Sequence, residues 1–326
     1  MAGLGYGQGV FPEAIRQRDV MVAARDGVEL ATDVHRPATG GVPTAEKLPV
    51  LLHRTPYDKN AADAVKIAEY LCRHGYVVMI QDIRRRHGSK GVFSKYYAYD
   101  SVDGFDTIEW AERQSYSNGE VGMYGTSYAA HTQADAAKLN PPSLKTVVLN
   151  MGGMSSAWDH SVRFDGAFEM GRQLTWAWGQ ILQGAKDPAV RELFTKEKFT
   201  DWYAALPLRK GLSPLAAMPN YEGYYLDEAT RSDYDSHWSG IGMNWEKFYP
   251  QTADIPMLHV GGWYDIYLRG TIENFRQLGK VEEAAGAFDD RALDASWEHA
   301  VLCGGCGFWG GGLHCGFRHG LSFAVV

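Results

Sequence analysis

Short apolar runs alternate with amphipathic stretches over the first 150 residues of the chain. The expected strands share an apolar or alternating pattern bounded by turn residues, and they lie at 20–24, 28–35, 48–53, 76–80, 121–124 and 144–150. The expected helices lie at 61–74, 100–114 and 128–139, and Gly75 follows the first of them in a C-cap position. This succession predicts an α/β fold whose mostly parallel sheet is covered by helices on both faces.

The pattern changes after residue 154. Residues 155–250 form aromatic-rich helical segments without a clear buried strand, which predicts an inserted helical cap. Its aromatic side chains either fill the core of the cap or line an apolar substrate pocket. The sheet resumes at 256–262. We therefore expect a first core part at 1–154, the cap at 155–250, a second core part at 251–302 and an atypical tail at 303–326.

Composition and charge exclude several classes of protein. The chain has 326 residues, 45% of them hydrophobic and 22% charged, which is typical of a globular protein. Its net charge of −7 argues against nucleic-acid binding, and a structural role is expected for the short cationic run at 84–86. Neither a signal-peptide pattern nor an apolar stretch of about 18 residues occurs, so we expect a cytoplasmic protein without a membrane partner. Its four cysteines do not resemble a disulfide scaffold.

One serine follows the strand expected at 121–124. Gly125 and Ala129 flank Ser127 at a distance of two residues, which matches four of the five positions of the G-x-S-x-G pattern. In that pattern a sharp strand-to-helix turn lifts the serine hydroxyl clear of the sheet, where a base can remove its proton. Ser127 is therefore the candidate nucleophile.

A nucleophile of this kind needs an acid after a later strand and a histidine after the next one. Asp265 stands at the end of the strand expected at 256–262, where it fits the acid; alternatively it is the N-cap of a helix. His299 comes 34 residues later, with room for one helix and one strand between them. It is the expected base. His259 is expected to be a packed core residue, and His131 to line the pocket or lie at the surface.

Acyl transfer also needs hydrogen-bond donors for the developing oxyanion. The backbone N–H of Tyr128, directly after the nucleophile, supplies one donor. The second is expected in the loop after the strand at 48–53, where the phenol of Tyr57 is a candidate. The alternative for Tyr57 is an ordinary turn residue after a proline.

Five motifs together resemble the cocaine esterase and X-Pro dipeptidyl-peptidase group of α/β-hydrolases, which includes the α-amino-acid ester hydrolases. They are R-x-P-Y-x-K at 54–59, an altered D-x-R-G-x-G-x-S-x-G segment at 82–91, D-G-x-D-T-I-E-W at 103–110, S-N-G-x-V-G-M-x-G-x-S-Y at 117–128 and G-W-Y-D at 262–265. The resemblance implies an α/β-hydrolase core with Ser127 as nucleophile, Asp265 as acid, and Tyr57 and Tyr128 as the oxyanion hole.

The resemblance further implies a serine hydrolase that acts on small-molecule esters or on amides of an N-terminal dipeptide through an acyl-enzyme. It implies no metal or organic cofactor. The inserted helices would set the specificity. The sequence leaves open whether the chain assembles into an oligomer.

The chain departs from the family at two internal positions and at its end. The family has glycine where Ala130 and Arg85 stand, and its histidine lies in G-P-W-x-H before a C-terminal jelly-roll domain. That domain is expected to be missing here, because the chain ends 27 residues after His299 in a segment rich in glycine and cysteine. One hypothesis is a truncated or frameshifted, catalytically inactive hydrolase-fold protein. Its rival is a zinc site in the tail, formed by Cys303, Cys306, His314, Cys315 and His319, although a second ligand pair at ordinary spacing is absent.

Overall fold

A central sheet forms the body of the structure, a computed structural model that describes residues 10–93, 95–96, 99–204, 206–279 and 299–304. Within these residues the strand order is β1-β2-β5-β4-β6-β7-β10-β11, with β3 paired to β2. The strands are β1 Glu13–Ala23, β2 Glu29–Thr39, β3 Val42–Pro43, β4 Leu48–Thr55, β5 Val77–Asp82, β6 Ser117–Thr126, β7 Leu144–Asn150, β10 Met257–Gly262 and β11 His299–Gly304. Pairing from β5 through β11 is parallel, while β2 is antiparallel to its neighbours.

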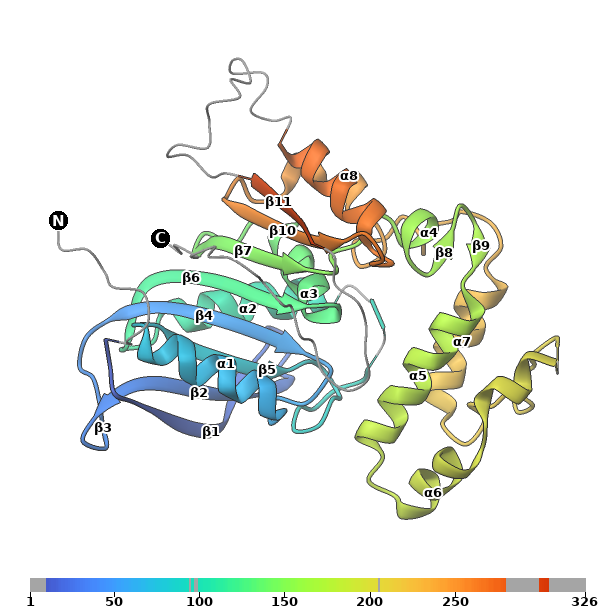
Figure 1. Cartoon of the computed structure of the whole chain (residues 1–326), viewed down its shortest axis with the longest axis horizontal. Helices are drawn as coiled ribbons and strands as arrows, with labels where there is room; N and C mark the ends of the chain where they lie inside the picture. The colour runs from blue at the N-terminus through green and yellow to red at the C-terminus, as the bar shows by residue number, and fades with distance from the viewer. Residues whose placement is uncertain (1–9, 94, 97–98, 205, 280–298, 305–326) are drawn as a thin grey trace.

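Helices cover both faces of this sheet (Figure 1). They are α1 Ala62–Arg73, α2 Tyr99–Glu112, α3 Tyr128–Ala137 and α8 Leu268–Leu278. Because side chains alternate along a strand, Val50 and Leu52 of β4 join the core under α2 and α3, whereas Leu51 joins the smaller core under α1. The α/β-hydrolase arrangement expected from the sequence is thus the one observed.

Residues between β7 and β10 form a largely helical insertion at the end of the sheet (Figure 1). Its elements are α4 Ala157–His160, β8 Arg163–Phe164, β9 Ala167–Phe168, α5 Met170–Gly184, α6 Pro188–Lys196, η1 Phe199–Ala204, α7 Pro219–Thr230 and η2 Glu246–Gln251. The two-residue strands β8 and β9 pair as a short hairpin that the sequence did not predict. Trp178 packs on Phe194 inside this insertion, with ring centroids 4.5 Å apart.

Two boundaries illustrate how the sequence specifies its elements. Gly75 follows α1 with a φ of +94°, the left-handed conformation that glycine adopts at low cost after a helix. Strand β1 begins at Glu13, seven residues before the expected start, because most of its length is only half-buried or exposed and lacks a clear apolar alternation.

Candidate active site

The turn between β6 and α3 holds Ser127 in a strained backbone conformation. Its φ of +61° and ψ of −123° are rarely adopted by a residue with a side chain. Ser127 N donates to Asn150 O at 3.0 Å, and Ser127 O accepts from Ala130 N and His131 N. These bonds tie the turn to β7 on one side and to the first turn of α3 on the other. The serine therefore stands at the carboxyl edge of the sheet, as the nucleophile-elbow pattern predicts.

Two glycines make room for this turn. A Cβ on Gly125 would lie 2.7 Å from Ala129 Cβ, and a Cβ on Gly152 would lie 2.3 Å from Ser127 O. The same Gly152 Cβ would lie 2.9 Å from Ala130 Cβ. Ala130, where the family has glycine, is accommodated because Gly152 opposite it has no side chain.

Tyr57, in the loop after β4, points its hydroxyl at the serine. Tyr57 Oη lies 3.0 Å from Ser127 Oγ, and Trp176 Nε1 of the insertion donates to Tyr57 Oη at 3.4 Å. Burial raises the pKa of Tyr57, which hydrogen bonds from Ser127, Trp176 and the Tyr128 backbone lower only in part. The phenol is thus a neutral hydrogen-bond donor at neutral pH, and it lies beside the backbone amide of Tyr128.

The side chain of Tyr128 points away from the serine into a buried network. Tyr128 Oη donates to Asp100 Oδ2 at 2.7 Å and accepts from Tyr96 N at 2.9 Å. Burial raises the pKa of Asp100 to about 6. This network fixes the tyrosine ring, and so the amide at the start of α3.

Asp265 follows β10 at the same edge of the sheet. Its Oδ1 accepts from Tyr267 N at 3.1 Å, while Oδ2 is buried and has no hydrogen-bond partner among the described residues. Burial raises the pKa of Asp265, against a lowering by the Tyr267 amide and by Arg172. The N-cap of α8 is Tyr267, and Asp265 makes a capping-type hydrogen bond to its N–H, so the structure keeps both roles considered for Asp265. Its free oxygen can accept an N–H, as a triad acid must.

His299 occupies a different position from the one that a base would need. Register pairs Thr126 with Asn150, Asn150 with Val260, and Val260 with Leu302, so Leu302 is level with the residue before Ser127. His299 begins β11 three residues earlier, about 10 Å toward the opposite edge. The backbone therefore does not bring His299 to the end of the sheet that carries Ser127 and Asp265.

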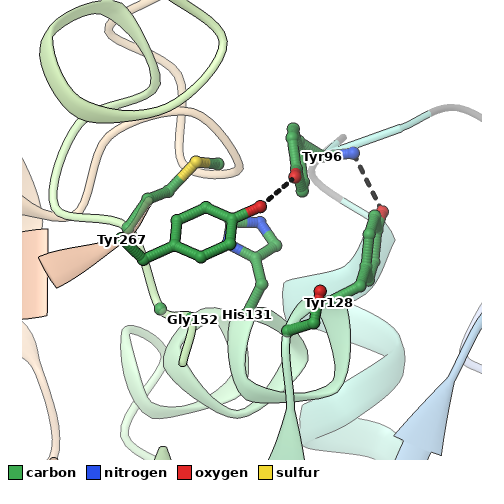
Figure 2. A pocket seen from close by; sticks show the side chains of 8 residues that line it. Tyr96, Tyr128, His131, Gly152 and Tyr267 are labelled. Atoms are coloured by element: carbon green, nitrogen blue, oxygen red, sulfur yellow. Dashed lines mark hydrogen bonds between the residues drawn. The ribbon is translucent and has the colours of Figure 1, made fainter. Parts of the chain in front are cut away.

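A narrow pocket lies beside the serine. Its lining residues come from the loop before α2, the elbow, the segment after β7 and the loop after β10: Tyr96, Ser127, Tyr128, His131, Gly152, Gly153, Met154 and Tyr267. Figure 2 shows the Tyr267 ring in front of His131, with its hydroxyl 3.5 Å from that of Tyr96. Of the two positions expected for His131, the structure shows the pocket lining.

Sequence reasoning did not single out Trp176 or Tyr96. Trp176 lies on α5 of the insertion, 119 residues after its partner Tyr57. The aromatic richness of the insertion was the one available signal, and both readings of it hold: Trp178 fills the insertion's own core, while Trp176 reaches the site. The packing of α5 over the sheet decides which of these two tryptophans fills the core of the insertion and which one reaches the site.

The arginine run at 84–86 is structural, as expected. Arg84 pairs with Asp103 and Asp26, and Arg86 Nε donates to Pro56 O at 2.9 Å beside Tyr57. Arg85, where the family has glycine, is exposed and has a φ of +56°. The left-handed backbone explains the family's glycine, and the arginine retains that conformation.

No group of three metal-ligating side chains that could hold a metal ion is found in the part of the chain that the structure describes. The rival zinc site falls on residues whose side chains lie outside that part. None of the described helices is both long and apolar enough to cross a membrane.

Comparison with protein families gives a match over residues 26–300 to the X-Pro dipeptidyl-peptidase (S15) family. The chain belongs to this family. Cocaine esterase from Rhodococcus sp. is 30% identical over 301 residues, which cover 88% of this chain and 49% of the esterase. A putative serine esterase from Mycobacterium bovis is 27% identical over 225 residues, covering 62% of this chain and 33% of that protein. This S15-family chain thus spans half or less of the length of these relatives.

Solved structures show the same fold. An aminopeptidase from a marine sediment Thaumarchaeota archaeon superposes with a TM-score of 0.62 at 25% identity, covering 87% of this chain and 48% of that one. An α-amino acid ester hydrolase superposes with a TM-score of 0.61 at 23% identity, covering 86% and 48%. The fold of this S15-family chain is therefore shared with these neighbours over about half of their length.

Proposed function

We propose that this chain is a serine hydrolase that cleaves acyl esters or X-Pro-type dipeptidyl amides through an acyl-enzyme. The observation that carries the proposal is the strained Ser127 turn with Tyr57 Oη 3.0 Å from Ser127 Oγ. The names of the relatives, an esterase and an X-Pro dipeptidyl-peptidase family, support both leaving-group types.

In the proposed reaction Ser127 Oγ attacks the carbonyl carbon of the substrate and its proton passes to a histidine. The carbonyl oxygen becomes an oxyanion, which accepts hydrogen bonds from the Tyr57 hydroxyl and the Tyr128 amide. The histidine then gives the proton to the departing alcohol or amine. Water resolves the acyl-enzyme by the same route. Asp265 Oδ2 accepts the second N–H of the imidazole and orients it.

The register of β11 bears on which histidine acts as the base. His299 begins its strand, whereas the base should follow it, because Asp265 follows β10 at the edge that holds Ser127. We assign the base to one of the two histidines that come after β11 in the chain, His314 and His319, which lie outside the described residues. The position of His299 equally supports the alternative of an inactive hydrolase-fold protein.

Covalent labelling by a fluorophosphonate tests the proposal. The purified chain should be labelled and should hydrolyse an activated ester, and Ser127→Ala should abolish both, because it removes the hydroxyl that attacks the reagent. Ser232→Ala, a change at an exposed serine of the insertion, serves as the matched control and should be labelled like the wild type. Labelling that persists in Ser127→Ala would refute the nucleophile, and an unlabelled but folded wild type would favour the inactive alternative.

A further inference from the structure

Helix α5 of the insertion contacts both ends of Tyr57. Gln183 Nε2 donates to the backbone oxygen of Tyr57 at 2.8 Å, and Trp176 Nε1 donates to its hydroxyl oxygen at 3.4 Å. The two donors are seven residues apart on α5, which places them on the same face of the helix, two turns from each other. Tyr57 is therefore held at its carbonyl and at its hydroxyl by a single helix.

The loop that carries Tyr57 is joined to α5 at a third point. Arg86 Nε donates to Pro56 O at 2.9 Å, and Arg86 Nη2 donates to Gln180 O of α5 at 3.4 Å. The Arg86 side chain is buried, so water does not compete for these bonds. The arginine thus links the residue before Tyr57 to the same helix.

Stacking contacts fix the plane of the Trp176 indole. Its ring stacks on that of Tyr128 with centroids 5.9 Å apart and an interplanar angle of 17°. It also stacks on Phe93, with centroids 6.2 Å apart and an angle of 25°. An indole N–H lies in the plane of its ring, so the contacts that hold the ring also hold the direction of the N–H toward Tyr57.

The chemistry of the two groups decides which atom donates. An indole N–H can only donate, whereas a phenol has one proton to donate and lone pairs that accept. The bond from Trp176 therefore occupies a lone pair of Tyr57 Oη and leaves the phenol proton free for Ser127 Oγ, 3.0 Å away. Burial raises the pKa of Tyr57, and the bond from Trp176 partly opposes this rise, which makes the phenol a better donor than it would be without the indole.

We propose that Trp176 is a positioning residue for the oxyanion hole: its indole N–H orients the Tyr57 hydroxyl so that the phenol proton points at the substrate's carbonyl oxygen. The inference rests on the proposed serine-hydrolase function. Trp176 acts through Tyr57, so the role requires no contact between the indole and the substrate. Because the negative charge on that oxygen develops in the transition state, the N–H of Trp176 should contribute to kcat and not to substrate binding.

The test replaces Trp176 by benzothienylalanine, which has a sulfur atom in place of the N–H and nearly the same shape. The kcat for an activated ester should fall about three- to tenfold, the contribution of one neutral hydrogen bond, with KM little changed. Tyr57→Phe should lower kcat about a hundredfold or more, because it removes an oxyanion donor. In the Tyr57→Phe background, the replacement of Trp176 should cause no further loss, because the indole then has no hydroxyl to orient.

Benzothienylalanine at Trp178 serves as the matched control. It makes the same chemical change inside the core of the insertion, where the indole donates to Phe194 O at 3.0 Å, and it should give the wild-type kcat. The end point of fluorophosphonate labelling gives the concentration of reactive Ser127 in each protein, so that kcat refers to folded enzyme alone.

Three results in a labelled protein would overturn the role of Trp176 while leaving the hydrolase function in place. One is an unchanged kcat, and another is an equal fractional loss in the wild-type and Tyr57→Phe backgrounds, which indicates a structural role. The third is a raised KM at unchanged kcat, which indicates that the indole binds the acyl group. An unlabelled wild type would overturn the hydrolase function itself.

Discussion

At the scale of single residues, the tightest point of the site is the contact between Gly152 and the Ser127 carbonyl. A Cβ on Gly152 would lie 2.3 Å from Ser127 O, a backbone atom already bonded to Ala130 N and His131 N. Gly152→Ala should therefore displace the elbow, lower the melting temperature and cost about 1–3 kcal/mol of stability. The rate of ester hydrolysis should fall by more than the loss of folded protein explains, because the nucleophile itself moves.

Gly179 provides the matched control for this substitution. It lies exposed within α5, and a Cβ there would meet nothing within 4 Å. Gly179→Ala should raise stability by about 0.5–1 kcal/mol, since alanine restricts the unfolded chain more than glycine does. Calorimetric melting of the two variants checks both signs. A Gly152→Ala protein with wild-type melting and activity would show that the turn can shift without cost.

Residue by residue, local sequence could predict those parts of the site that one turn of chain builds. Ser127 and its flanking small residues were predictable because strand, turn and helix are contiguous. The approach of Trp176 to Tyr57 was not, because it depends on how a helix 119 residues later packs over the sheet. The buried hydrogen bond from Tyr128 to Asp100 could not be predicted for the same reason, since the local sequence does not determine where the ring of the tyrosine after the nucleophile points.

At the scale of elements, a buried ion pair joins the insertion to the core. Lys95 precedes α2, and its Nζ lies 3.8 Å from Glu228 Oε2 on α7. The same Nζ donates a hydrogen bond to Gln173 Oε1 on α5. Burial lowers the pKa of Lys95 to about 8 and raises that of Glu228, while each partner opposes the shift of the other. The charged form of each side chain is thus stabilised by the other, and the pair holds α5 and α7 to the loop that lines the pocket.

Removing one partner of this pair should be more damaging than removing both. Lys95→Met leaves the Glu228 carboxylate buried without its counter-charge, and a loss of about 3–5 kcal/mol is expected. The double variant Lys95→Met, Glu228→Leu should lose less than Lys95→Met alone, and so clearly less than the sum of the single changes. Denaturant unfolding followed by tryptophan fluorescence measures the cycle, because Lys95 Nζ lies 4.9 Å from the centroid of the Trp176 ring.

The control cycle uses Lys196 and Glu192 of α6, an i,i+4 pair whose side chains are 73% and 63% exposed. Its coupling should stay at or below about 0.5 kcal/mol, since water screens an exposed pair. If the Lys95 and Glu228 losses were additive, the pair would not join the insertion to the core energetically.

The same scale shows why some elements were predictable and others not. Strands β4, β5 and β7 read clearly because they are buried and apolar, and α1 because its end carries Gly75. The β8–β9 hairpin was missed because two residues a side give no period to detect. The length of β1 was underestimated because its exposed side chains do not alternate.

At the scale of the whole molecule, the order and register of the strands decide which side chains meet. Loops after β4, β6 and β10 bring Tyr57, Ser127 and Asp265 to the carboxyl edge of one sheet. The number of residues between Asp265 and His299 fitted a base, but spacing along the chain does not reveal register. Only the pairing of His299 with Met257 shows that this histidine begins β11 instead of following it.

Glutamine substitutions of the three histidines after Asp265 test this reading of the sheet. His299→Gln should keep ester hydrolysis and fluorophosphonate labelling, because its backbone lies about 10 Å short of the level of Ser127 along the strand. Either His314→Gln or His319→Gln should lower kcat at least a hundredfold, the scale of a lost general base, with KM little changed. In the wild type, activity should fall at acid pH because the imidazole of the base becomes protonated. The residual activity of the variant that lacks this base should not show that fall. Loss of activity in His299→Gln alone would mean that β11 pairs in another register. Wild-type activity in all three variants would place the base elsewhere in the chain. His131 would then be the first residue to substitute, in combination with these three.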